Sequence, residues 1–128
     1  MTPNEALAEL LTLSAQVREI AILGESGFVL ASTGAVQRGE QLAQVAVDLI
    51  AAAGDVRPGA AEISRIQISS EGTDVFLVRD AGRIAIATTA PDSIAGLMVY
   101  DLRTMLARLD AEQAAPRPAK KRKGQIDA

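Results

Sequence analysis

Few side chains of this 128-residue chain have the types and spacing that chemistry requires. The sequence contains no histidine and no cysteine, so the commonest general base and the soft metal ligands are absent. Glu71 and Asp74 flank a turn and could form a carboxylate pair for acid–base work, but solvated turn carboxylates are more common. Arg57 could reach another protein's phosphates as an arginine finger, but a solvated loop arginine is more common. We therefore expect no enzymatic activity.

The glycines do not form a phosphate-binding motif. No G-x-x-x-x-G-K-[ST] loop is present, and Gly24, Gly27 and Gly34 do not fit the dinucleotide-binding fingerprint. Gly24 and Gly27 instead suit a hairpin turn. One tyrosine and two phenylalanines cannot form a stacking platform for bases. We therefore expect neither a cofactor nor sequence-specific nucleic-acid binding.

The charge of the chain is unevenly distributed. Residues 114–128 contain five basic side chains and one acidic one, a net charge of +4, and they include every lysine. Residues 1–113 contain eight basic and 15 acidic side chains, a net charge of −7. Two prolines and clustered charge in residues 114–128 predict a disordered basic tail that solvates the protein or contacts an acidic partner or anionic surface.

The remaining residues, 1–113, are expected to form one domain, because this length is typical of a single core. No apolar run approaches the ~18 residues of a membrane span, and the N-terminus lacks the basic-then-apolar order of a signal peptide. The absence of cysteine gives no sign of an oxidising compartment. These features predict a cytoplasmic protein without a transmembrane segment.

Three helices and five strands are predicted. Thr2, Pro3 and Glu5 form a helix-start signal for residues 3–14. Two β-rich runs, 17–23 and 28–33, flank a glycine-containing turn, and residues 34–39 should form a loop. Strands at 62–70, 74–79 and 83–89 form a meander, whose last two members are apolar on both faces and should be central. Residues 90–93 should cap a last helix, with Ile94 on its apolar side.

A helix at residues 38–56 has more apolar surface than one sheet requires. Its Ala, Val, Leu and Ile side chains cover an arc of roughly 220°, whereas a surface helix usually buries little more than ~100°. This excess favours packing on a second surface, although burial within one domain remains open. The expected fold is α+β, a five-stranded antiparallel sheet with one helix on one face and two on the other.

This order of elements resembles the Roadblock family, small dimeric modules that include the dynein light chain roadblock and bacterial regulators of Ras-like GTPases. The resemblance covers residues 5–109 and is carried by four stretches: EIAILGESGFVLAST, AQVAVDLIAAAG, DVFLVRDAGRIAIATT and APDSIAGLMVYDLRTML. These are patterns of order and spacing rather than catalytic motifs. The resemblance implies a profilin-like Roadblock domain with no catalytic residue to carry over.

The resemblance also implies that strand 62–70 lies at a sheet edge, where two copies join edge to edge with their central helices in contact. An exposed strand edge is a liability unless it is paired or covered. Two-fold pairing would cover this edge and the excess apolar arc together. The predicted dimer interface consists of Leu42, Val45, Ala46, Leu49, Ile50, Ala53, Ile63, Arg65, Gln67 and Ser69.

Members of the family usually act as non-catalytic platforms, which predicts a homodimeric adaptor that binds and regulates a small Ras-like GTPase. Any stimulation of GTP hydrolysis would come from ordering the GTPase's own switch elements. The candidate GTPase contacts are Arg38, Gln41, Gln44 and Asp48. The alternatives are a dimeric scaffold anchored through its basic tail and a small-molecule sensor. The sensor is disfavoured because little aromatic or polar material is available for a pocket.

Overall fold

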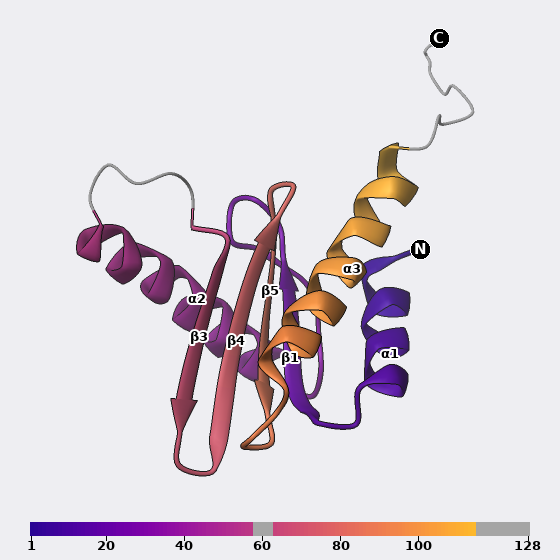
Figure 1. Ribbon diagram of the computed structural model, residues 1–128. Helices are drawn as coiled ribbons and strands as arrows, with labels where there is room; N and C mark the ends of the chain where they lie inside the picture. The colour runs from indigo at the N-terminus through magenta and orange to yellow at the C-terminus, as the bar shows by residue number, and fades with distance from the viewer. Residues whose placement is uncertain (58–62, 115–128) are drawn as a thin grey trace, which may run out of the picture.

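The structure of the protein, a computed structural model, describes residues 1–57 and 63–114. Its elements are, in order, α1 (Pro3–Leu13), β1 (Val17–Leu23), β2 (Val29–Ser32), α2 (Val36–Val56), β3 (Arg65–Ser70), β4 (Thr73–Asp80), β5 (Arg83–Thr89) and α3 (Ala95–Ala114). The strands form one antiparallel sheet in the order β2-β1-β5-β4-β3 (Figure 1). The predicted α+β class and order of elements are confirmed.

Alternation along the strands divides the core into two layers. Ile20 and Ile22 of β1 pack with α1 and α3, whereas Ala21 and Leu23 point to the opposite face and pack with α2. Figure 1 shows α2 behind the sheet and α1 and α3 in front of it. The predicted arrangement of one helix on one face and two on the other is therefore confirmed. The strands predicted to be central also lie inside the sheet, with β5 in the middle.

The start of α1 follows the predicted signal. The Thr2 hydroxyl accepts a hydrogen bond from the Glu5 amide (3.1 Å), and the Glu5 carboxylate accepts one from the Thr2 amide (2.7 Å). This reciprocal capping satisfies two amides that lack intrahelical partners. The helix ends at Leu13, one residue before the predicted end, because Ser14 has an extended backbone.

Helix α2 begins at Val36, two residues before the predicted start, so much of the predicted 34–39 loop is helical. The glycine at position 39 favoured a loop in the sequence, but here it allows close packing. A Cβ on Gly39 would lie 2.3 Å from Ser32 Oγ and 2.8 Å from Ser32 Cβ. The missing side chain therefore lets α2 approach β2.

The last helix begins later than the sequence indicates. Ser93, one of the residues predicted to cap it, donates its hydroxyl hydrogen to Thr89 Oγ1 (3.0 Å) and to the Ala90 carbonyl (2.8 Å). These bonds hold the end of β5, and α3 starts at Ala95. The prediction for Ile94 was wrong, because this residue precedes the helix and is exposed.

Two predicted segments extend beyond the described residues. The predicted strand 62–70 begins at Arg65 in the structure, and residue 62 lies outside the described part. The predicted basic tail, apart from Ala114, also lies outside it. Within the described residues, the helices are too short or too polar to cross a membrane.

Candidate protein-interaction surface

Strand β3 forms an open edge of the sheet, as the sequence predicted. Its six residues pair with β4 in continuous register, and the Arg79 amide donates to the Ser64 carbonyl (2.8 Å). Because main-chain groups alternate in direction along a strand, those of Arg65, Gln67 and Ser69 point away from β4. Described residues form no further strand on that side. The edge therefore presents unpaired main-chain donors and acceptors.

A half-exposed apolar flank of α2 lies on the same face as the isoleucines of β3. Val45 is 43% exposed, and Leu49, one turn further along the helix, is half-buried. Leu49, Ile66 of β3 and Val75 of β4 all pack against the same buried cluster. Ile68 pairs with Val75 and is therefore on the same side of the sheet. We call Val45, Leu49, Ile66, Ile68 and Val75 the apolar flank.

Two residues of the predicted interface are not available to a second copy. Leu42 is 3% exposed and Ala46 is 0% exposed, because both face the protein's own sheet. The sequence could not separate them from Val45 and Leu49, since all four lie on one apolar arc. Ile50 and Ala53 are half-buried, and Ile50 packs against the cluster beneath α2. Ile63 is also half-buried.

Arg38, a candidate GTPase contact, is held by an ion pair within the chain. Its guanidinium donates from Nε to Glu19 Oε2 (2.7 Å) and from Nη2 to Glu19 Oε1 (2.9 Å). It also donates to Gln41 Oε1 (3.1 Å). The hydrogen bonds from Arg38 hold the pKa of the Glu19 carboxyl below its usual value. Arg38 therefore ties the start of α2 to β1.

Gln44 and Asp48 form the outward polar strip of α2 with Gln41. The Gln44 amide donates to Asp48 Oδ1 (2.9 Å), across one helical turn. All three side chains are exposed. The four candidate contacts thus divide into an Arg38–Gln41 pair near the start of the helix and a Gln44–Asp48 pair further along.

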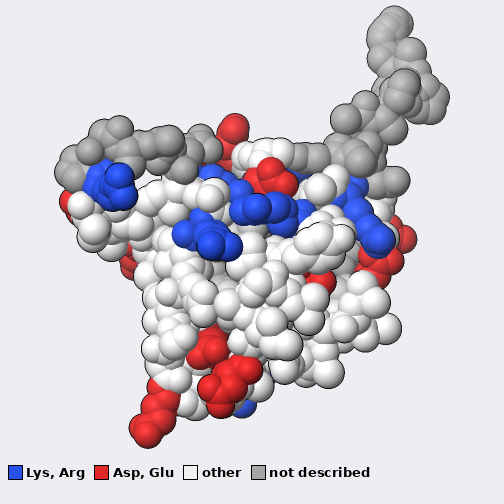
Figure 2. Space-filling view, in the orientation of Figure 1, with Lys and Arg blue, Asp and Glu red and all other residues white. Residues whose placement is uncertain are grey.

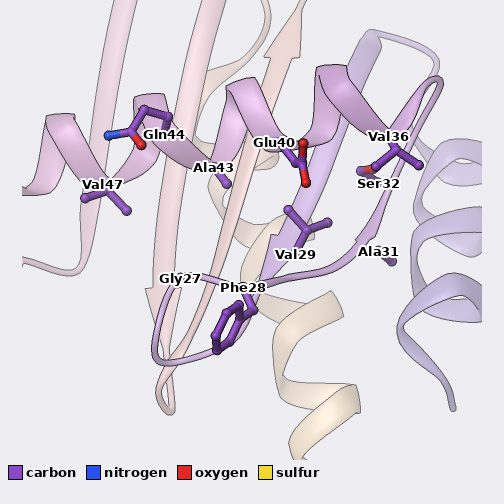
Figure 3. A pocket seen from close by; sticks show the side chains of 10 residues that line it. All are labelled: Gly27, Phe28, Val29, Ala31, Ser32, Val36, Glu40, Ala43, Gln44 and Val47. Atoms are coloured by element: carbon purple, nitrogen blue, oxygen red, sulfur yellow. The ribbon is translucent and has the colours of Figure 1, made fainter.

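On the other side of α2, a groove of about 630 Å³ separates the helix from the β1–β2 hairpin. Figure 3 shows Phe28 at the hairpin, with Glu40 and Val47 on the helix above it. Phe28 and Val36 are each 73% exposed, and Val47 is 46% exposed. We call this hollow the β2–α2 groove; it is lined by Gly27, Phe28, Val29, Ala31, Ser32, Val36, Glu40, Ala43, Gln44 and Val47.

Charges of opposite sign lie at the two ends of β3. Figure 2 shows basic side chains across the upper part of the face with α3 and β3, and acidic side chains at its lower end. These basic side chains are arginines, since every lysine lies in residues 120–123. Arg65 begins β3, and Glu71 follows its last residue in the turn to β4. The strand therefore runs from a basic end to an acidic end.

The residues considered for chemistry do not form a common site. Glu71 is exposed in its turn, whereas Asp74 is buried under the face that contains α3. Arg57 follows the last residue of α2, where its amide donates to the Ala53 carbonyl (3.3 Å) and its side chain is exposed. Among the described residues, no three acidic side chains gather as metal ligands would. The 120–123 lysine run lies outside the described part.

Comparison with known proteins supports the architecture. No protein-family model and no curated sequence matches the chain. A Roadblock/LC7 domain from Streptomyces avermitilis has a similar structure, with a TM-score of 0.76 and 13% identity over 88% of this chain and 98% of that domain. The chain has the Roadblock/LC7 fold. The resemblance predicted from the sequence is thereby confirmed at the level of the fold.

Two further structures share the Roadblock/LC7 fold of this chain. The gliding protein MglB from Thermus thermophilus has a TM-score of 0.68 and 19% identity, over 84% of this chain and 87% of that one. MglB from Myxococcus xanthus has a TM-score of 0.65 and 12% identity, over 90% of this chain and 88% of that one.

Sequence reasoning missed several surface residues of this Roadblock/LC7 fold. Val75 was placed in a strand with no assigned surface, although it belongs to the apolar flank. Phe28, Val36 and Val47 were not recognised as lining a groove. The width of the apolar arc was a usable signal, because it implied exposure at both flanks of α2. The position of the hairpin was not evident from the sequence.

Proposed function

We propose that the protein is a non-catalytic homodimeric adaptor that binds and regulates a small Ras-like GTPase. The observation that carries the proposal is the open edge of β3 beside the apolar flank of α2. One two-fold contact would pair the edge and bury the flank. The sequence resemblance to bacterial regulators of Ras-like GTPases and the fold shared with the gliding protein MglB support the same function.

The side chains of β3 favour one register for this contact. Antiparallel pairing centred on Gln67 places Ile66 of one copy opposite Ile68 of the other, so that four isoleucines meet beside the two α2 helices. It also places Arg65 opposite Ser69 rather than opposite a second arginine, and like charges directly opposite each other are destabilising. The basic end of one strand then lies near Glu71 of the other copy.

Two valines of α2 provide a matched test of the dimer. Val45 and Val47 are similarly exposed, but Val45 belongs to the apolar flank and Val47 to the β2–α2 groove. Val45→Glu should yield a monomer in multi-angle light scattering, because it places a charge in the buried contact, and Val47→Glu should remain dimeric. Ala46→Glu cannot replace Val45→Glu, since Ala46 lies in the core and its substitution would unfold the protein.

GTPase binding requires a separate measurement. The proposed contact surface is the outward strip of α2, with Gln41, Gln44 and Asp48 exposed on both helices of the dimer. Isothermal titration with Ras-like GTPases of the same organism, loaded with GDP or a GTP analogue, should detect binding. Asp48→Lys should weaken this binding, whereas Glu9→Lys, the same charge change on α1 at the other face of the sheet, should not.

Failure of the dimer test and failure of the GTPase-binding test would have different meanings. A dimer that binds no such GTPase in either nucleotide state would contradict regulation and leave a dimeric scaffold. A wild-type protein that is monomeric at high concentration would contradict the proposed contact itself.

A further inference from the structure

The β2–α2 groove lies on the opposite flank of α2 from the proposed dimer contact, so a dimer would leave it open. Its volume of about 630 Å³ is within the range of ~300–1,000 Å³ that is typical of ligand sites. Large apolar side chains border it, and Phe28 and Val36 are mostly exposed to water. Exposed apolar side chains gathered around one hollow indicate an interaction site.

Glu40 gives the groove a chemical preference. It is the only charged residue in the lining, and within the described residues its carboxylate has no hydrogen bond or ion pair. Figure 3 shows this side chain directed from α2 toward Val29, over the floor of the groove. A matching occupant therefore combines an apolar side chain with a nearby cationic group.

The chain itself contains a segment of this composition. Residues 120–126 read KKRKGQI, a run of four cationic side chains followed by the single large apolar residue of the last 15, Ile126. Residues 1–113 have a net charge of −7, which favours association with this segment.

The segment is also long compared with the domain. From Ala114, the last described residue of α3, twelve residues lead to Ile126, and an extended chain spans up to ~3.3–3.6 Å per residue, or about 40 Å. A domain of this size has a radius of gyration of roughly 13 Å. Fully extended, the segment is therefore about three times as long as this radius of gyration.

We propose that the β2–α2 groove binds residues 120–126 of the same chain, with Ile126 between Phe28 and Val47 and a lysine ammonium at the Glu40 carboxylate. This docking does not depend on the proposed GTPase. A consequence that does rest on the proposed function is competition, because Gln44 lines the groove and also belongs to the outward strip. The tail would then limit access of the GTPase to α2.

The absence of cysteine makes the proposal directly testable. Gln125→Cys provides one attachment point for a nitroxide spin label in the full-length protein. The expected result is a loss of amide signal intensity at Phe28, Val36 and Val47 in ¹⁵N spectra with the oxidised label, relative to the reduced label. Residues of β3 should keep their intensity. An unchanged groove, or equal losses over the whole surface, would overturn the proposal.

Matched variants of the labelled protein test the charged contact at Glu40 and the apolar contact of Ile126 separately. Glu40→Lys should restore the signals of the groove, whereas Glu9→Lys, which makes the same charge change on α1 at the other face of the sheet, should leave the losses in place. If both variants restored them equally, the tail would be following net charge and the proposed site would be wrong. Ile126→Ser should also restore the signals without changing the charge.

A mixing experiment tests whether the segment binds its own copy. Unlabelled ¹⁵N protein is combined with spin-labelled protein of natural isotope content. Groove signals should keep their intensity in this mixture. A loss there would contradict docking on the same copy.

Discussion

The two edge strands of the sheet differ in length, regularity and cover. β2 has four residues, its pairing with β1 shifts between Ile22 and Leu23, and α2 packs closely on it at Gly39. β3 has six residues in continuous register with β4. Helix α2 packs mainly on β1, β2 and β5; in Figure 1 it crosses behind β3, and its end extends past the outer edge of that strand.

This difference indicates that a strand of a second chain would pair with β3 rather than with β2. Short length, irregular register and cover by a helix are the features that protect a strand edge from pairing with another chain. β2 has all three, whereas β3 has none of them. The charges of β3, basic at one end and acidic at the other, also favour an antiparallel copy of the same strand.

The largest effect is expected from cysteine placed at the centre of β3. In the proposed register Gln67 faces Gln67 of the second copy as a hydrogen-bonded pair, with Cα atoms ~5.5 Å apart. A disulfide requires roughly 4.4–6.8 Å. Gln67→Cys should therefore become a covalent dimer under mild oxidation, visible on a non-reducing gel.

Ser69→Cys is the matched control, because residue 69 faces Arg65 of the second copy and its own counterpart is four residues away along the strand. It should remain monomeric on the same gel. Rapid cross-linking at position 69 but not at 67 would show a different register, and cross-linking at neither would contradict edge pairing.

A smaller effect is expected at the covered edge. Gly39→Ala would place a Cβ 2.8 Å from Ser32 Cβ, and this backbone-anchored atom cannot rotate away. Overpacking of this kind costs about 1–3 kcal/mol, which exceeds the gain in helix propensity of ~1 kcal/mol. The variant should be destabilised in urea denaturation.

Gly54 supplies the control within the same helix. No atom lies within 4 Å of a Cβ built there, so Gly54→Ala should gain up to ~1 kcal/mol of stability from propensity alone. If Gly39→Ala were also stabilising, the close contact between α2 and β2 would not exist in solution.

The fold could be predicted from the sequence because its patterns are local. β-rich and apolar runs separated by turns predicted the strands, and the Thr2–Glu5 cap fixed the start of α1. The errors occur where a distant contact decides the structure. Gly39 lies within α2 and packs against Ser32 of β2, and Ser93 bonds to the end of β5 instead of capping α3.

The candidate site was predictable in outline and not in detail. The apolar arc of α2 indicated a second contact surface. Helical periodicity alone, however, does not show which part of the arc faces the protein's own sheet. Ala46 and Val45 both lie on the arc, yet the first is in the core and the second is exposed. The same limitation concealed the β2–α2 groove, because Phe28 and Val47 meet only after the hairpin folds against the helix.

The smallest effect concerns the ion pair that ties the covered half of α2 to β1. Arg38 and Glu19 are 43% and 33% exposed, so the pair should contribute less than ~1 kcal/mol. Arg38 lowers the pKa of the Glu19 carboxyl. The stabilisation is therefore complete above the unfolded pKa of ~4.3 and is lost as pH falls through the lower folded value.

In urea denaturation, wild type should be more stable than Glu19→Gln at pH 7, and the difference should shrink below the unfolded pKa. A difference independent of pH would show that the contribution of Glu19 does not come from the charge of its carboxylate.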